Sequence, residues 1–339
     1  MLQCIIFSMK TALFWKTEKG KIRCSLCPRH CLIEANSLGY CKARKNINGK
    51  LVSLAYGKPV SLGVDPIEKK PLYHFYPGSR AFSLGTAGCN LCCFWCQNWQ
   101  ISQKSQPEMK AVDPEKIIKL AKENNCNSIA YTYTEPTIFY EYVLDIAKLA
   151  KKAKIKNVIV SNGFIEKEPL EKLCKYIDAA NIDLKTIDPK THLKYTGAWL
   201  EPILATLKTL KNKKVWTEVT NLIVPGINDD PKQILKLAKW IKENLGADTP
   251  LHFSAFHPAH KLVELEPTSA ETVKKARESA MKISLNYVYS GNILDAEGST
   301  TYCPKCKEPV IRRSLFEVME NKVVKGKCPC GEKIAGAWD

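Results

Sequence analysis

The chain has 339 residues, of which 45% are hydrophobic, and its 51 Lys and Arg against 34 Asp and Glu give a formal net charge of +17. This length suits one barrel with small appendages, and the apolar content is sufficient for a full core. No run of about 18 apolar residues occurs, which excludes a membrane-spanning helix. The 15 cysteines are typical of a reducing compartment, where clustered thiols bind metal more often than they form disulfides, and we expect a cytoplasmic protein.

The first expected domain, residues 1–74, is a basic N-terminal lobe rich in cysteine. Its apolar opening lacks the basic leader and the cleavage site of a signal peptide. The lobe carries 13 Lys and Arg against 4 Asp and Glu, which suits a nucleic acid or an acidic protein, although a solvated lysine surface explains the charge equally well. With His30 as a substitute ligand, four thiols could close a metal site: Cys24, Cys27, Cys31 and Cys41. Zinc, a second iron–sulfur cluster and free buried thiols all remain open.

The second expected domain, residues 75–296, alternates β-branched runs with amphipathic helices. Two of the helices have clear starting signals, Asp113-Pro114 and Asp230-Pro231. The expected strands are 81–84, 128–133, 157–161, 180–184, 215–223, 251–256 and 286–289. Strands separated by helices indicate βαβ units and a parallel sheet. The predicted fold class is therefore α/β, a partial (β/α)6 barrel of the TIM type.

The loop after the first of these strands holds four cysteines within eight residues: Cys89, Cys92, Cys93 and Cys96. Taken as C-x3-C-x2-C, the first, third and fourth of them can ligate three irons of a [4Fe–4S] cluster and leave the fourth iron open to substrate. The ferredoxin spacing, which closes all four irons, is absent. The set with Cys92 in the middle is also geometrically possible, and a zinc knuckle or a redox dithiol is the non-catalytic alternative.

This motif, with Trp95 before its last cysteine, resembles the signature of the radical SAM superfamily. The segments 65–72, 74–78, 88–91 and 96–99 further resemble the AmmeMemoRadiSam-type enzymes, which are relatives of the pyruvate formate-lyase activating enzymes. The likeness extends over nearly the whole chain, and residues 9–13 resemble the usual opening of that family, so we expect the native protein to begin at Met9.

The resemblance implies the cofactors and the partners. We expect a [4Fe–4S] cluster whose catalytic ligands are Cys89, Cys93 and Cys96, with S-adenosylmethionine bound at its open iron. We expect a low-potential electron donor of the flavodoxin or ferredoxin type as a partner, and no membrane partner.

The resemblance also assigns polar side chains at the strand ends, where a parallel barrel gathers its reactive groups, to S-adenosylmethionine. Glu135 would accept a hydrogen bond from the amino group of the cofactor, and Ser161 and Asn162 would suit its ribose. Their structural alternatives are ordinary ones, such as a helix-capping carboxylate at Glu135.

The resemblance also implies that Asp183 and Lys185 point toward the sulfonium and the carboxylate of the cofactor. A buried charge pair is unfavourable unless it serves a function, which favours this role. His257 would lie near the cofactor carboxylate, and Trp95 would pack by the adenine. The alternative for Asp183 and Lys185 is a surface ion pair. His257 could instead be an ordinary polar neighbour, and Trp95 a core tryptophan.

The third expected domain, residues 297–339, is a zinc-ribbon-like module. A C-x2-C pair and a later C-x-C pair would hold one zinc ion: Cys303, Cys306, Cys328 and Cys330. The second pair is one residue shorter than a usual knuckle, so a strained or metal-free knuckle is the alternative.

Together these features predict a radical SAM oxidoreductase that cleaves S-adenosylmethionine reductively to a 5′-deoxyadenosyl radical. One hypothesis is an activating enzyme that makes a radical on a partner protein, favoured by the strand-end motifs. A second is RNA modification, favoured by the basic lobe and the terminal ribbon. A third is a non-catalytic zinc-binding nucleic-acid adaptor. The sequence does not identify the substrate that loses hydrogen.

Overall fold

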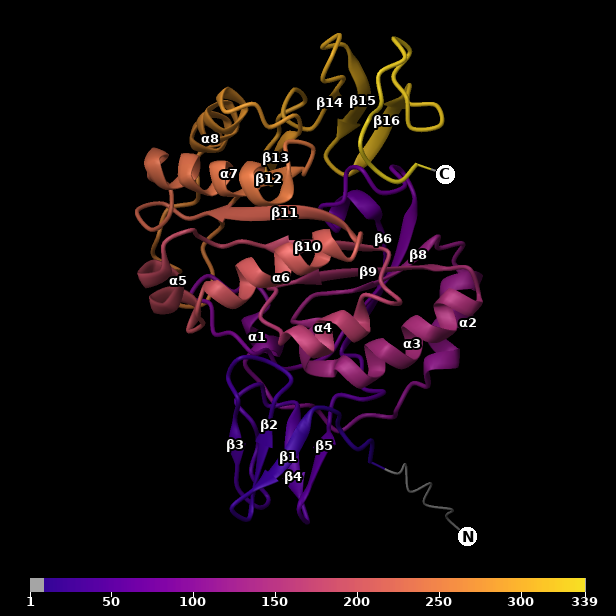
Figure 1. Ribbon diagram of the computed structural model, residues 1–339, viewed down its shortest axis with the longest axis vertical. Coiled ribbons are helices and arrows are strands. Elements are labelled where there is room, and N and C mark those ends of the chain that lie inside the picture. The colour runs from indigo at the N-terminus through magenta and orange to yellow at the C-terminus, as the bar shows by residue number, and fades with distance from the viewer. Residues whose placement is uncertain (1–8, 339) are drawn as a thin grey trace.

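The computed structural model describes residues 9–338, so the expectation about where the native chain begins concerns residues that lie outside the described part. Figure 1 shows three parts along the long axis: a lobe of short strands at the bottom, a layer of helices and strands in the middle, and a small β module at the top. No helix in the described part combines the length and the hydrophobicity that a membrane span requires.

The middle part is an open eight-stranded sheet in which seven parallel strands follow one another in chain order. The parallel strands are β7 (Arg80–Gly85), β8 (Ser128–Tyr131), β9 (Lys156–Ser161), β10 (Ala179–Asp183), β11 (Trp216–Ile223), β12 (Leu251–Ala255) and β13 (Val288–Gly291). The two edge strands do not pair with each other within the described residues, so the barrel is partial. The predicted α/β class and all seven predicted strands are confirmed.

The structure adds an eighth strand, β6 (Ser61–Pro66), which pairs antiparallel with β7 and forms one edge of the sheet. The expected N-terminal domain, residues 1–74, includes this segment. Its Gly, Asp and Pro residues are poor strand formers, and proline is tolerated only at a sheet edge. Tertiary pairing rather than local propensity therefore makes this strand.

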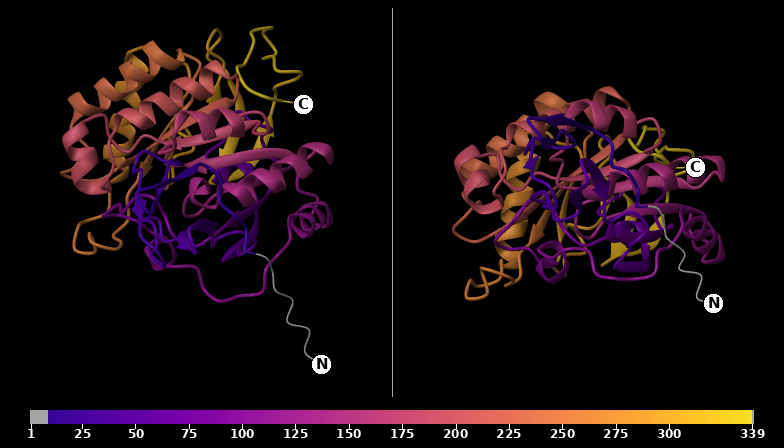
Figure 2. Two further views of the ribbon diagram at one scale, coloured as in Figure 1. Left: turned by 60° about the horizontal axis from the view of Figure 1, so that its bottom comes forward. Right: turned by 90° about the horizontal axis from the view of Figure 1, so that it is seen from below.

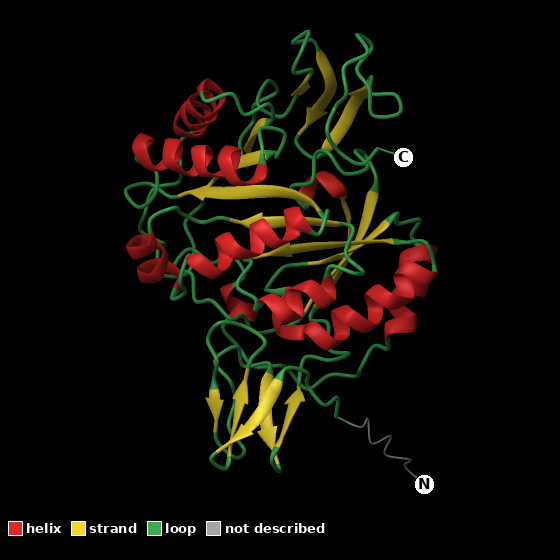
Figure 3. Ribbon diagram, in the orientation of Figure 1, coloured by secondary structure: helices red, strands yellow, loops and turns green. Residues whose placement is uncertain are grey.

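Helices lie along the outer side of the sheet, as Figure 3 shows. They are α1 (Trp99–Ser102), α2 (Pro114–Glu123), α3 (Tyr140–Lys152), α4 (Lys167–Leu173), α5 (Pro189–Thr196), α6 (Glu201–Asn212), α7 (Pro231–Leu245) and α8 (Ala270–Lys282), with short 3-10 turns at Ile67–Lys69 and Pro136–Phe139. Both predicted starting signals are where expected, and the Asp230 carboxylate accepts a hydrogen bond from the Lys232 N–H at 3.1 Å.

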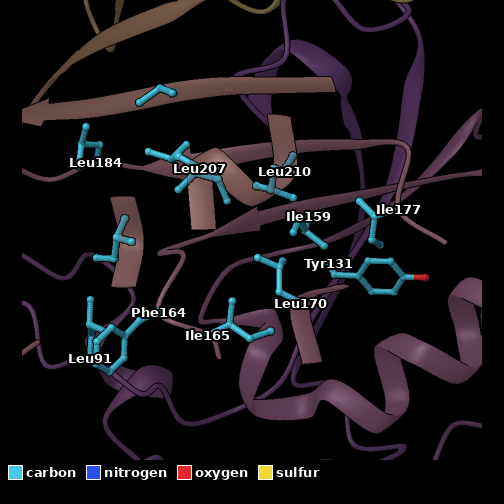
Figure 4. Close-up of a cluster of buried hydrophobic side chains, with 14 of the residues drawn as sticks. Leu91, Tyr131, Ile159, Phe164, Ile165, Leu170, Ile177, Leu184, Leu207 and Leu210 are labelled. Carbon is cyan, nitrogen blue, oxygen red and sulfur yellow. The ribbon is translucent and has the colours of Figure 1, made fainter. Parts of the chain in front are cut away.

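The hydrophobic core fills the space between the sheet and these helices. All four residues of β8 are buried, as expected for a strand covered on both faces. In Figure 4, Tyr131 of β8 and Ile159 of β9 lie beside Leu170 of α4, while Leu207 and Leu210 project from α6. This packing fixes the positions of the strands, and therefore of the loops that follow their carboxyl ends.

The N-terminal lobe consists of a three-stranded sheet, β1 (Trp15–Glu18), β2 (Lys21–Cys24) and β3 (Leu32–Ile33), and a hairpin of β4 (Arg44–Ile47) and β5 (Lys50–Ser53). Figure 2 brings this lobe to the front of the barrel. A buried ion pair joins the two parts, because the Arg44 guanidinium donates to the Glu141 carboxylate of α3 and both side chains are 1% exposed. Loss of one partner would leave a buried charge, which typically destabilises a protein by about 3–5 kcal/mol.

The C-terminal module is a small antiparallel sheet of β14 (Thr301–Tyr302), β15 (Pro309–Ser314) and β16 (Glu317–Asn321). The imidazole of His74, which is fully buried, links it to the barrel. Its Nδ1–H donates to the Ala335 carbonyl oxygen at 2.6 Å, and its Nε2 accepts from the Tyr289 hydroxyl at 2.5 Å. The bond that Nε2 accepts requires the neutral ring.

We predict that stability falls with acid because of this histidine. Burial lowers the pKa of His74 to about 4, whereas the unfolded side chain takes up a proton near pH 6.5. Between these pH values only the unfolded state binds the proton, so the free energy of unfolding should decrease by up to about 3 kcal/mol as the pH falls.

Urea unfolding between pH 7 and pH 4 measures this change. The His74→Gln variant should show a shallower pH dependence than the parent, and His260→Gln, which changes a half-buried ring stacked on Trp99, serves as the control. Parallel profiles for the parent and His74→Gln would contradict the assignment.

Candidate active site and metal centres

A cleft of about 430 Å³ lies at the carboxyl ends of the parallel strands, where the cysteine loop forms one of its walls. Seven of the residues predicted from the sequence line it: Cys89, Cys93, Cys96, Trp95, Asn162, Asp183 and Lys185. They come from the loop after β7 and from the ends of β9 and β10. This convergence follows from the parallel topology, which brings the carboxyl ends of the strands to one edge.

The cysteine loop separates its two candidate middle thiols. Cys93 lines the cleft, whereas Cys92 does not. The Cys92 thiol instead donates to the Thr196 carbonyl oxygen at 3.6 Å, and its backbone N–H bonds the same oxygen at 3.0 Å. Gly197 leaves room for this sulfur, since a Cβ there would lie 2.7 Å from it. Of the two possible triplets, the one with Cys93 has all three thiols in the cleft.

Burial controls the protonation of two of these thiols. It raises the pKa of Cys89 well above the ordinary thiol value, with the Glu135 carboxylate adding to the effect, and raises the pKa of Cys93 to about 12. Without a metal, Cys89 and Cys93 would be neutral thiols, and a metal that binds them displaces their protons. The donor set is thus suited to iron: three sulfur ligands on one loop, beside an open cleft.

Trp95 lies on the same wall, with 3% of its surface exposed. Its ring stacks on Tyr195 with the centroids 6.0 Å apart. Its indole N–H has no hydrogen-bond partner among the described residues. A buried, unpaired donor beside a cleft is available to a bound ligand.

Asp183 and Lys185 form an ion pair, with 2.9 Å between the ammonium and carboxylate groups, at the end of β10. Burial disfavours the charged ammonium, but the Asp183 carboxylate, together with Cys93 and Cys96 in their thiolate forms, outweighs it and raises the pKa of Lys185 above its ordinary value. The Lys185 side chain therefore remains charged in the cleft, as a cofactor carboxylate would require.

Glu135 does not line the cleft. Its fully buried carboxylate accepts hydrogen bonds from the N–H and hydroxyl of Thr137 at 2.9 and 2.6 Å, from the Ser161 hydroxyl at 2.8 Å and from the Asn162 N–H at 2.8 Å. Ser161 is outside the cleft lining as well. Asn162 reaches it and donates to Asn90 at 2.9 Å. Glu135 and Ser161 thus hold Asn162 in position.

His257 lines a neighbouring cleft of about 710 Å³ instead. The two clefts share Gln97, Asn292 and Phe316. Phe316 belongs to the turn between β15 and β16, so the C-terminal module contributes to both clefts.

Lys70, which has no role in the sequence-based assignment, also lines the cleft, and its ammonium pairs with the Asp65 carboxylate at 2.7 Å. The Tyr133 hydroxyl, also in the lining, donates to the same carboxylate at 2.9 Å. The sequence signal that could have indicated Lys70 is the run of charged residues within segment 65–72, at the end of the edge strand β6.

The C-terminal cysteines form a compact group whose four sulfur atoms all lie within 4.8 Å of one another. Cys303 and Cys330 are separated by 3.6 Å, and Cys306 and Cys328 by 3.7 Å. Tetrahedral zinc with Zn–S bonds near 2.3 Å separates its sulfurs by about 3.8 Å. The short C-x-C pair therefore reaches the geometry of a single-ion site.

Comparisons with known proteins agree with this site. Residues 83–241 match the family model of the radical SAM superfamily. An uncharacterized protein of Methanocaldococcus jannaschii is 46% identical over 332 residues, which cover 96% of this chain and 99% of that protein. A pyruvate formate-lyase-activating enzyme of Staphylococcus epidermidis is 25% identical over 221 residues, 59% of this chain and 88% of that enzyme.

Among solved structures, Streptococcus suis SuiB bound to its precursor peptide SuiA matches 67% of this chain and 51% of its own, with a TM-score of 0.51 and 18% identity. At such identity the likeness shows the fold alone. The family model covers the cysteine loop and most of the strands that build the cleft. The chain therefore belongs to the radical SAM superfamily, a family of enzymes that implies a [4Fe–4S] cluster and S-adenosylmethionine as cofactors.

Proposed function

We propose that Cys89, Cys93 and Cys96 hold a [4Fe–4S] cluster and that the adjoining cleft binds S-adenosylmethionine for reductive cleavage. The observation that carries this proposal is the convergence of these three thiols with Trp95 and Lys185 on one cleft of about 430 Å³. That volume falls within the usual range for small-molecule sites. The cofactors, when bound, supply methionine and a 5′-deoxyadenosyl radical, which takes a hydrogen atom from the substrate.

The residues of the chain bind and orient the cofactor. The charged Lys185 would pair with the carboxylate of S-adenosylmethionine, and the unpaired Trp95 N–H would donate to a polar atom of the adenosyl part. Asn162, held by Glu135, would bond the ribose. The walls of the cleft would exclude water from the reacting atoms.

We propose a partner protein as the substrate, as in an activating enzyme. The support is the named relatives, which include a 4-hydroxyphenylacetate decarboxylase activating enzyme of Clostridium scatologenes, 27% identical over 165 residues that cover 46% of this chain and 53% of that enzyme. The second cleft, of about 710 Å³, adjoins the cofactor cleft and would receive the segment that loses hydrogen.

The electron would come from a low-potential flavodoxin or ferredoxin in a reducing cytoplasm. The adaptor hypothesis conflicts with membership of a family of enzymes.

We further propose that the C-terminal cysteines hold a structural zinc ion. Four thiolates fill the tetrahedral shell of zinc and leave no position for a substrate, and closed sites of this kind stabilise folds. The backbone N–H of Glu332 lowers the pKa of Cys330 to about 7, with help from the neighbouring thiols.

The first prediction from this proposal distinguishes the two middle cysteines. Cys93→Ala should reduce 5′-deoxyadenosine release to background, because it removes a cluster ligand, whereas Cys92→Ala should stay near the parental rate. Chromatography of anaerobic, dithionite-reduced reactions measures the product. Turnover in Cys93→Ala together with its loss in Cys92→Ala would reverse the ligand assignment.

A second prediction concerns Lys185. Removal of its charge in Lys185→Met should raise the KM for S-adenosylmethionine, since a charge-assisted hydrogen bond contributes about 1.5–3 kcal/mol, or roughly 10- to 100-fold in affinity. Lys190→Met, on α5 and outside the cleft lining, is the matched control. An unchanged KM in Lys185→Met would exclude the proposed contact.

A third prediction concerns the zinc site. Cys303→Ala should lose about one zinc ion per chain and lower the melting temperature, yet keep 5′-deoxyadenosine release per folded molecule within a few-fold of the parent. Cys174→Ala, which changes a cysteine outside all three sets, should keep both the zinc and the stability. Metal analysis and thermal melts provide the measurements, and full zinc content in Cys303→Ala would refute the site.

A further inference from the structure

The N-terminal lobe contains a second set of converging cysteines. Cys24, Cys27, Cys31 and Cys41 all line one cavity between the lobe and the barrel. Much of the remaining lining is apolar, with Leu26, Ile33 and Ile138 among it. The first three thiols follow the spacing C-x2-C-x3-C, which is the spacing of the central motif in reverse order. Unlike the central loop, this set includes a fourth thiol.

The distances between the sulfur atoms separate this set from the zinc-like one. Among residues 9–338, the four C-terminal cysteine sulfurs lie within 4.8 Å of one another, whereas no three sulfurs of either other set do. A single tetrahedral ion needs its sulfurs about 3.8 Å apart. In a cluster each thiolate ligates a different iron, so the sulfurs stand farther apart. The N-terminal thiols, like Cys89, Cys93 and Cys96, are therefore not gathered around the position of a single ion.

A buried cation faces the same cavity. Arg44, which is 1% exposed, lines it and donates to the Cys24 sulfur at 3.7 Å. The Nε–H of this guanidinium has no hydrogen-bond partner among the described residues. The charge of the guanidinium already pairs with Glu141. An anionic iron–sulfur centre would give the free Nε–H a partner, and hydrogen bonds to the sulfurs are one of the ways in which proteins set cluster potentials.

His30 is not needed as a ligand. Its Nε2 lies 2.7 Å from the Glu166 carboxylate, on the side of the lobe that meets the chain after β9. Four thiols alone suffice for a closed cluster.

The cavity adjoins the proposed catalytic centre. Asn90 lines it, whereas the residues on either side, Cys89 and Leu91, line the catalytic cleft. One stretch of the loop after β7 thus separates the two sites. Arg29, also in the lining, fixes this stretch by donating to the Asn90 carbonyl oxygen at 2.5 Å.

We propose that Cys24, Cys27, Cys31 and Cys41 bind an auxiliary [4Fe–4S] cluster in which the protein ligates all four irons. The arrangement leaves no open iron, so this cluster does not bind S-adenosylmethionine. It lies directly behind the loop that carries the catalytic ligands.

The test removes the central ligands and counts the iron that remains. The full chain with Cys89→Ser, Cys93→Ser and Cys96→Ser, purified anaerobically, should retain about four irons and four sulfides per chain, where the parent holds about eight. Its dithionite-reduced EPR spectrum should not change when S-adenosylmethionine is added. Further substitution with Cys24→Ser and Cys27→Ser should remove this iron. The matched control adds Cys126→Ser and Cys174→Ser instead and should keep it.

Loss of all iron from the triple variant would overturn the proposal. This holds whether the variant then contains one zinc ion per chain, at the C-terminal cysteines, or two, with the second at the N-terminal thiols. If the triple variant does not fold, Cys24→Ser/Cys27→Ser in the otherwise native chain decides. That variant should lose half of the parental iron and keep the EPR signal that responds to S-adenosylmethionine. Retention of all iron there would overturn the proposal, while an unresponsive signal in the parent would instead refute the proposed cofactor site.

Discussion

The close approach of the N-terminal lobe to the cysteine loop is the constraint on which the site depends. Gly88, at φ +89°, precedes the first cluster cysteine, and any Cβ there would collide with the carbonyl oxygen of Cys41. The absence of a side chain lets the two backbones touch, and the left-handed conformation turns the chain into the loop. The lobe therefore forms part of the support of the cysteine loop, and the buried pair of Arg44 and Glu141 keeps it in place.

The chain carries three cysteine sets that differ in geometry. The C-terminal sulfurs lie close enough for one ion, and their module is joined to the barrel through His74 and through Arg313, which donates to the Tyr73 carbonyl oxygen at 2.7 Å. The other two sets are wider and lie on opposite sides of the same loop. A single-ion site needs short distances between sulfurs, whereas a cluster supplies its own inorganic scaffold between them.

Two buried carboxylates beside the cleft act indirectly, by positioning other side chains. Glu135 uses its carboxylate to hold Ser161 and Asn162 at the end of β9. Asp65 similarly orients Lys70 and Tyr133. In both cases the carboxylate is satisfied by protein donors. The residues that face the cleft are Asn162, Lys70 and Tyr133, rather than the carboxylates themselves.

The sequence by itself determined the fold class, the seven parallel strands and the position of the cysteine loop after the first of them. Hydrophobic alternation and cysteine spacing are local properties of the chain. It also placed Asp183 and Lys185 correctly at a strand end. The resemblance favoured Cys93 over the adjacent Cys92, and the tertiary structure adds the physical reason, since the Cys92 thiol is held by Thr196, 104 residues away. The structure likewise decided that β6 joins the sheet and brings Lys70 to the cleft. These outcomes depend on contacts between segments far apart in the chain, which no local pattern records.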